Sequence, residues 1–318
     1  MSFRATASIA ATLVLAAGGA LYAQRGGSRA DSLLRDGAVE RAESMYYAAV
    51  RAQPRNPEAR WELGRYLISR GALRVGATLI EEAMRFGLDS AVGAAALAPV
   101  YLQIGQTQAL AALPAAALGA SERARARWLV DHPSRAIAPD TLIAVAYQPS
   151  TGGAIGTVAL RLNGRTIDAT IDAHARGLVV SDAAASSVQL RRFSSGSAST
   201  RGMPAVVDSL GIGRLSIANV PVTIASDISA PVMIGLDAFG PYAPTFDPRA
   251  RRVLLHPTGV SSAAAPDATV LQTLSVEGDL LVARGGGWAS LTSPMLGSLL
   301  RDHRWTVDAR RGRIIVEP

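Results

Sequence analysis

The sequence predicts a chain of two structural classes, an N-terminal α-α solenoid followed by a mostly β barrel with a partial C-terminal repeat. Glycines recur at 34-residue intervals at Gly37, Gly71 and Gly105, a period typical of stacked helix pairs. After Gly153 the apolar residues alternate with polar ones, which is the pattern of strands with one buried face. A length of 318 residues suffices for about two domains.

Composition excludes several classes of function. The chain has no cysteine, which excludes a disulfide framework, a thiolate nucleophile and a cysteine zinc site. Its four histidines, His132, His174, His256 and His303, show no metal-ligand spacing, so we expect no metal and no cofactor. The net charge is +7, but the arginines are dispersed and aromatic residues make up only 5%. We therefore expect no nucleic-acid partner.

The N-terminus has the pattern of an export signal. Arg4 precedes an uncharged apolar stretch, and Ala23 is followed by polar residues, so residues 1–23 are predicted to be a secretory signal peptide. Residues 5–23 are also long enough for an uncleaved membrane anchor, and a buried helix is a further alternative. With a signal or an anchor, the protein is exported and is periplasmic, secreted or anchored at the inner membrane.

Residues 31–130 carry the 34-residue period. At this spacing Leu33 aligns with Leu67 and Tyr101, and the segment from Trp61 to Gly64 has the large and small residues of a helix pair. The segment resembles the tetratricopeptide repeat, which implies a peptide or protein partner. The alternative is that the repeats only dock on the neighbouring domain. Residues 131–154, rich in proline and glycine, are predicted to be a linker.

Residues 155–257 hold the candidate chemistry. A strand leads to Asn163-Gly164, a hairpin-turn signal, and the return strand runs into Asp172-Ala173-His174. Further along are the apolar Ile234-Gly235 element and a strand pair that begins near Asp247.

This order resembles the retropepsin-like (single-lobe) family of aspartic proteases. The resemblance implies a flap over Ser194–Val207, with Gly196 and Gly202 as its candidate glycines. It also implies polypeptide substrates, Asp172 as the catalytic carboxylate, and a homodimer, because one lobe supplies only one of the two carboxylates that this chemistry needs.

The sequence departs from the family at the motif, where Asp172-Ala173-His174 stands in place of Asp-Thr-Gly. Three interpretations stay open: an altered working dyad, a degenerate module that binds peptide or acts as a scaffold, and an ordinary turn carboxylate. His174 is equally explained as the hydrogen-bonded partner of a carboxylate. Asp168 lies on the same side of the strand, as a solvated edge charge or a second carboxylate.

The last residues echo this region. Residues 245–257 align without a gap with residues 306–318, and Met233-Ile234-Gly235 parallels Met295-Leu296-Gly297. Residues 266–318 are therefore predicted to be a partial second lobe that forms an intramolecular pseudo-dimer, with each glycine ending a strand. Convergence of two unrelated hairpins is the alternative. The leading function is an exported protein of this protease family that acts on or binds polypeptides, and the alternative is an inactive peptide-binding or scaffold protein.

Overall fold

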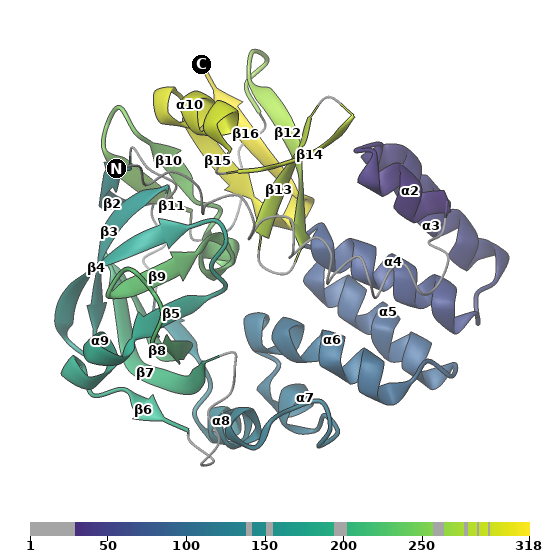
Figure 1. Cartoon of the computed structure of the whole chain (residues 1–318), viewed down its shortest axis with the longest axis horizontal. Helices are drawn as coiled ribbons and strands as arrows, with labels where there is room; N and C mark the ends of the chain where they lie inside the picture. The colour runs from purple at the N-terminus through teal and green to yellow at the C-terminus, as the bar shows by residue number, and fades with distance from the viewer. Residues whose placement is uncertain are drawn as a thin grey trace, which may run out of the picture.

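The structure is a computed structural model that describes residues 29–137, 142–150, 155–193, 202–256, 264–276, 279–284, 286–291 and 293–318. A helical part is followed by a mostly β part, and the C-terminal segment lies between the two (Figure 1). The expected signal peptide or anchor, residues 1–23, lies outside the described residues. Among the helices of the described ranges, none is long and apolar enough to cross a membrane.

The helical part is a succession of antiparallel neighbours joined by short turns. Its helices are α2 (Arg29–Arg35), α3 (Val39–Ala52), α4 (Pro57–Ser69), α5 (Leu73–Arg85), α6 (Ser90–Gln103), α7 (Thr107–Ala111) and α8 (Ala120–Asp131). Small residues let consecutive helices approach, since a Cβ on Gly64 of α4 would lie 2.9 Å from the Ile80 side chain of α5. Asn56 begins α4 by accepting hydrogen bonds from two free N–H groups of its first turn.

The same turn ends three of these helices at 34-residue intervals. Gly37, Gly71 and Gly105 have φ angles of 74°, 83° and 70°. In each turn the glycine N–H donates to the carbonyl three residues earlier, and the next N–H donates to the carbonyl five residues earlier. This is the Schellman arrangement, which favours glycine because a Cβ is costly at positive φ. The sequence period is therefore a period of helix, turn and helix, and its assignment to the tetratricopeptide class stays a prediction.

The β part contains a closed barrel. Its strands are β1 (Arg135–Ile137), β2 (Ile143–Pro149), β3 (Gly156–Leu162), β4 (Arg165–Asp172), β5 (Leu178–Ser181), β6 (Arg191–Arg192), β7 (Met203–Ile212), β8 (Leu215–Ala225), β9 (Val232–Gly235), β10 (Thr245–Asp247) and β11 (Arg252–Leu255). Strands β3, β4, β9, β5, β8 and β7 are hydrogen-bonded in this order, and β7 pairs back with β3. The short helices of this region are α9 (Asp182–Ser187) and η1 (Leu236–Tyr242).

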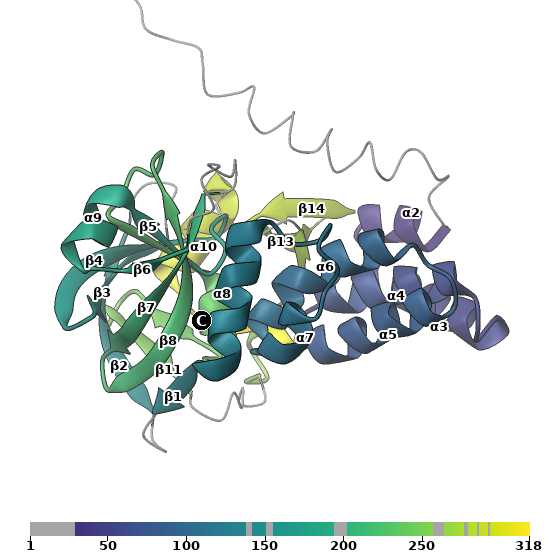
Figure 2. The same ribbon diagram turned by 90° about the horizontal axis from the view of Figure 1, so that it is seen from below.

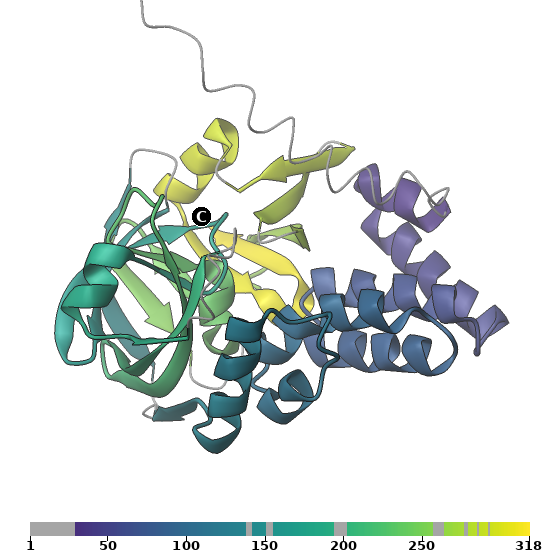
Figure 3. The same ribbon diagram turned by 60° about the horizontal axis from the view of Figure 1, so that its bottom comes forward.

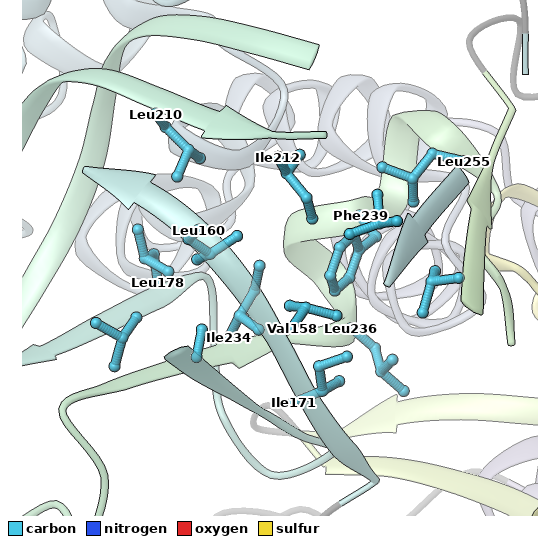
Figure 4. Packing of buried hydrophobic residues seen from close by; sticks show 14 of the residues in the cluster. Val158, Leu160, Ile171, Leu178, Leu210, Ile212, Ile234, Leu236, Phe239 and Leu255 are labelled. Atoms are coloured by element: carbon cyan, nitrogen blue, oxygen red, sulfur yellow. The ribbon is translucent and has the colours of Figure 1, made fainter. Parts of the chain in front are cut away.

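Alternating apolar residues of these strands fill the barrel. Val158 and Leu160 of β3, Ile171 of β4, Ile234 of β9 and Phe239 of η1 converge on one buried cluster (Figure 4). Each fully buried aliphatic side chain of this size contributes about 1.5–3 kcal/mol through the hydrophobic effect. The period-2 pattern read from the sequence thus forms the core that holds β4 in place.

The C-terminal segment adds β12 (Thr269–Val276), β13 (Asp279–Arg284), β14 (Gly287–Ser290), α10 (Pro294–Asp302), β15 (Arg304–Asp308), η2 (Ala309–Arg311) and β16 (Arg313–Glu317). Its last hairpin, β15–β16, repeats the register of β10–β11 at a sequence offset of 61 residues. Even the ion pairs coincide, with Asp247–Arg252 at 3.4 Å and Asp308–Arg313 at 3.0 Å. The gap-free alignment of the two sequences therefore describes two hairpins of the same geometry.

A local two-fold axis relates these hairpins. Strands β10 and β15 are antiparallel, and Thr245 lies opposite Thr306, its own equivalent in the second hairpin. The two buried hydroxyl groups are 2.7 Å apart. The helix η1 also lies against η2. An antiparallel pairing of equivalent residues is the geometry of an isologous dimer interface, here formed within one chain.

The helical part docks on both neighbours. The Arg70 guanidinium donates hydrogen bonds to the carbonyl oxygens of Thr273 and, at 2.8 Å, of Gly312, and the Trp288 indole donates to the Leu34 carbonyl at 2.5 Å. At the other end, α8 lies along the barrel (Figure 2) and buries Arg125, which donates to the Val222 carbonyl at 2.8 Å. The C-terminal segment is thus held between the barrel and the helices (Figure 3).

Two local expectations are wrong. Residues 131–154, expected to be a linker, contain β1 and β2, and β2 joins the sheet between β11 and β3. Met295-Leu296-Gly297, expected to end a strand as Met233-Ile234-Gly235 does, lies inside α10 instead. The reason is local, because Pro294 stands at the first helical position, where its fixed φ favours a helix.

Candidate functional site

The candidate carboxylate is delivered by β4. The strand starts from the Asn163-Gly164 turn, whose φ angles of 48° and 85° are those of a tight hairpin turn, as the sequence predicts. The Asn163 side chain secures this turn by accepting from the Ser209 N–H and donating to the Val188 carbonyl. At the far end, Asp172 lies beside Gly235 of the parallel strand β9.

The loop after β4 folds back on Asp172. One carboxylate oxygen of Asp172 accepts the His174 N–H at 2.8 Å, a local turn that Asp side chains commonly stabilise. Ala173 is buried, and its methyl side chain cannot form a hydrogen bond. The loop therefore lacks a side chain at position 173 that could form a hydrogen bond to a second motif loop.

Beneath the loop lies a second carboxyl group, Asp237, which the sequence analysis did not single out. It accepts the Gly177 N–H at 2.8 Å, and burial raises its pKa, while the Arg176 charge acts in the opposite direction. Gly235 packs so closely here that a Cβ would lie 2.9 Å from the Ala175 carbonyl carbon, and closer still to its oxygen. The sequence signal that could have identified Asp237 is its position, two residues after the Ile234-Gly235 element.

The C-terminal segment reaches the loop through Asp279. Its Oδ1 lies 2.5 Å from Nδ1 of His174, and the two side chains are 38% and 47% exposed. Asp279 begins β13, 105 residues away in sequence, so no local pattern pointed to it. The His174 imidazole thus lies within hydrogen-bond distance of the Asp279 carboxylate.

The strands of the C-terminal segment show which residues correspond to the motif. Strand β2 pairs with β11 as β12 pairs with β16, which makes Tyr147 equivalent to Thr273. These two residues lie opposite Val158 and Val282, which in turn lie opposite Ala169 of β4 and Ala289 of β14.

Counting two residues on from this last pair equates Ile171 with Leu291, and both are buried. The chain continues after Ile171 with Asp172, but after Leu291 with Thr292, which has no carboxylate.

The remaining candidates support the scaffold. Asp247 accepts the Ala250 N–H and pairs with Arg252, so it stabilises the β10–β11 turn. Gly202 precedes β7 with a φ of +86°, and the other flap candidate, Gly196, lies outside the described residues. Asp168 is exposed on β4, which agrees with a solvated edge charge.

Two cavities are described on the surface, and neither includes the residues of the motif loop. One, of about 340 Å³, lies between α2 and α3. The other, of about 450 Å³, lies at the β10–β11 turn. Within the described ranges no group of three or more histidine and acidic side chains is placed to hold a metal ion.

Comparisons with known proteins give little. No protein-family model matches the chain, and no curated protein matches it. Among solved structures, the chain is similar to a retropepsin-like aspartic protease from Rickettsia conorii, with a TM-score of 0.28 and 14% sequence identity over 38% of this chain and 92% of that chain. A likeness of this size shows neither the fold nor the activity of this chain.

Proposed function

We propose that this chain is an exported polypeptide-binding protein, built on a retropepsin-like barrel, that does not cleave the polypeptide it binds. The observation that carries the proposal is the strand register of the C-terminal segment. By this register Leu291 is the counterpart of Ile171, and the next residue in the sequence is Thr292 where the first lobe has Asp172, so the repeat carries no second motif aspartate.

The chemistry of aspartic proteases explains why one carboxylate is too few. Two carboxyl groups share one proton, so that one activates water while the other acts as the acid. In this chain the local two-fold axis already pairs β10 with β15, so the edge that a second copy would use is occupied from within. A homodimer that supplies a second Asp172 is therefore disfavoured.

The motif loop is also unsuited to the reaction. The Ala173 methyl group gives no hydroxyl for bracing two loops. Asp172 uses one oxygen to accept the His174 N–H, and the His174 ring is engaged by Asp279. These contacts support a loop held in place by the C-terminal segment.

The experiment is a cleavage and binding assay on the full-length chain. Fluorescein-labelled unfolded casein is incubated with wild type and with Asp172→Asn, between pH 4 and pH 7, with and without pepstatin. We expect binding by fluorescence anisotropy and intact casein on gels, with no difference between the two proteins. Asp168→Asn is the matched control, since it removes an exposed carboxylate from the same strand.

Pepstatin-sensitive cleavage that is lost in Asp172→Asn but kept in Asp168→Asn would show an active enzyme and refute the proposal. Failure of casein to bind would refute the polypeptide-binding part.

One observation favours a second candidate, a hydrolase with an altered dyad. His174 brings Asp279 to the loop that carries Asp172, so a second carboxylate is present even though it comes from another position. If this pair were catalytic, cleavage would be abolished by Asp279→Asn as well as by Asp172→Asn. We rank this candidate second because Asp279 reaches the loop by contacting the His174 imidazole, whereas the two carboxyl groups of an aspartic dyad share a proton directly.

A further inference from the structure

The two equivalent hairpins, β10–β11 and β15–β16, have different neighbours in the structure. At the second hairpin, the corner between the β15–β16 turn and β12 is covered by the α4–α5 turn. Arg70 donates hydrogen bonds there to the Gln272 side chain and to the carbonyl oxygens of Thr273 and Gly312. Gly71 lies against Ala309, so closely that a Cβ would be 2.8 Å from the Ala309 carbonyl carbon. A turn of polypeptide thus occupies this corner.

The first hairpin has the same corner. The Tyr147 N–H donates to the Arg251 carbonyl at 2.9 Å, as the Thr273 N–H donates to the Gly312 carbonyl at 2.7 Å. Arg251 and Gly312 share a left-handed backbone, with φ angles of 49° and 55°. The backbone that accepts the α4–α5 turn at one corner is therefore reproduced at the other.

At the first hairpin this corner is an open cavity of about 450 Å³. Its walls come from the end of β2, from the β10–β11 turn and from the end of α10. The lining residues are Gln148, Pro149, Ser150, Pro248, Arg249, Arg251, Arg301 and Asp302. Pro248 and Arg251 stand at the positions of Ala309 and Gly312, which are among the residues that contact the α4–α5 turn at the covered corner.

The charge of the cavity defines its ligand. Three arginines, Arg249, Arg251 and Arg301, and one acidic residue, Asp302, line the cavity. All four residues are exposed. Within the part of the chain that the structure describes, none of the three arginines forms an ion pair. Unpaired guanidinium groups around a hollow favour carboxylates, which they bind in a bidentate manner.

We propose that this cavity binds an acidic turn of a polypeptide partner, with Arg249 and Arg301 pairing its Asp or Glu side chains. A polypeptide is the expected class because the equivalent corner is filled by a polypeptide turn. It is expected to be acidic because three arginines line the cavity. The inference rests on the proposed function for its ligand class, but it places the contact away from Asp172, Ala173 and His174.

The test measures binding of fluorescein-labelled hexaglutamate to the full-length protein by anisotropy, with hexaglutamine as the uncharged control. Because the whole chain carries a net charge of +7, nonspecific attraction must be separated from the site. Arg310→Ala does so, since Arg310 is exposed and stands 61 positions after Arg249, at the same place in the other hairpin.

We expect Arg249→Ala and Arg301→Ala each to weaken hexaglutamate binding about two- to fivefold, with no change in Arg310→Ala or for hexaglutamine. The proposed site would be refuted if Arg310→Ala weakened hexaglutamate binding equally. It would also be refuted if the double variant, Arg249→Ala with Arg301→Ala, bound hexaglutamate with unchanged affinity. Displacement of hexaglutamate by inorganic phosphate at equal charge concentration would show a small-anion site and overturn the polypeptide assignment. Casein cleavage is tested at Asp172 and hexaglutamate binding at Arg249 and Arg301, so the two proposals can fail separately.

Discussion

Replacing the three turn glycines by alanine, one at a time, tests whether the helical part docks on the C-terminal segment in solution. The backbone is the same in all three turns, with φ angles between 70° and 83°, so each substitution carries the same conformational penalty of about 1–2 kcal/mol. The surroundings differ. A Cβ on Gly105 meets nothing within 4 Å, a Cβ on Gly37 would lie 3.1 Å from the Gly287 oxygen, and a Cβ on Gly71 would overlap the Ala309 carbonyl.

These surroundings predict a ranking. Gly105→Ala should lower the free energy of unfolding by about 1–2 kcal/mol, from the backbone alone. Gly71→Ala should lose about 1–3 kcal/mol more, the usual penalty for forcing atoms into a packed contact. Gly37→Ala should fall between, because its neighbour needs to move by only a few tenths of an ångström.

Urea denaturation of the full-length chain, followed by circular dichroism at 222 nm, gives the three free energies. Limited proteolysis serves as a second measurement, because loss of docking should speed cleavage of the C-terminal segment in Gly71→Ala and not in Gly105→Ala. Equal destabilisation by all three substitutions, with equal rates of proteolysis, would refute the docking of the α4–α5 turn on η2.

Three further predictions address the loop, the first hairpin and the N-terminus. Burial raises the pKa of Asp237, so its contribution to stability is fully present below the unfolded pKa of about 4 and is lost as the pH rises through the folded pKa. Asp237→Asn should therefore be more stable relative to wild type at pH 7 than at pH 4 by urea denaturation, and a difference independent of pH would contradict this. Arg251→Gly should raise the free energy of unfolding by about 0.5–1 kcal/mol, because glycine suits a φ of 49°, and a loss of stability would count against the equivalence with Gly312. N-terminal sequencing of the exported protein should begin near residue 24, and a sequence that begins at Met1 would favour the anchor.

Local signals predicted the local structure well. Asn163-Gly164 forms the expected turn because its two residues tolerate positive φ. The 34-residue spacing of Gly37, Gly71 and Gly105 marks real turns for the same reason. Such features depend on a few neighbouring residues, so one sequence is enough to identify them.

Pairings between residues far apart in the chain were harder to predict from the sequence. The alternation of Ile143, Val145 and Tyr147 was present in the sequence, but nearby prolines and glycines concealed it, and β2 is fixed by β11, which lies more than a hundred residues later. The contact of His174 with Asp279 likewise depends on how the C-terminal segment folds back. The candidate site could be located from the motif, and its partners could not.

Because one chain forms both sides of the Thr245–Thr306 pair, the two halves do not need to have the same sequence. In a homodimer every substitution appears twice, so a residue that suits one subunit's surroundings must also suit the other's. Here the two sides of the axis are encoded separately. One side can hold Gly312 against the Arg70 side chain while the other holds Arg251 at an open corner. A covalent link also removes the dependence of association on concentration, so dilution leaves the axis intact. Symmetry supplies the framework of this molecule, and the asymmetry that a single chain permits lets each half acquire its own surface.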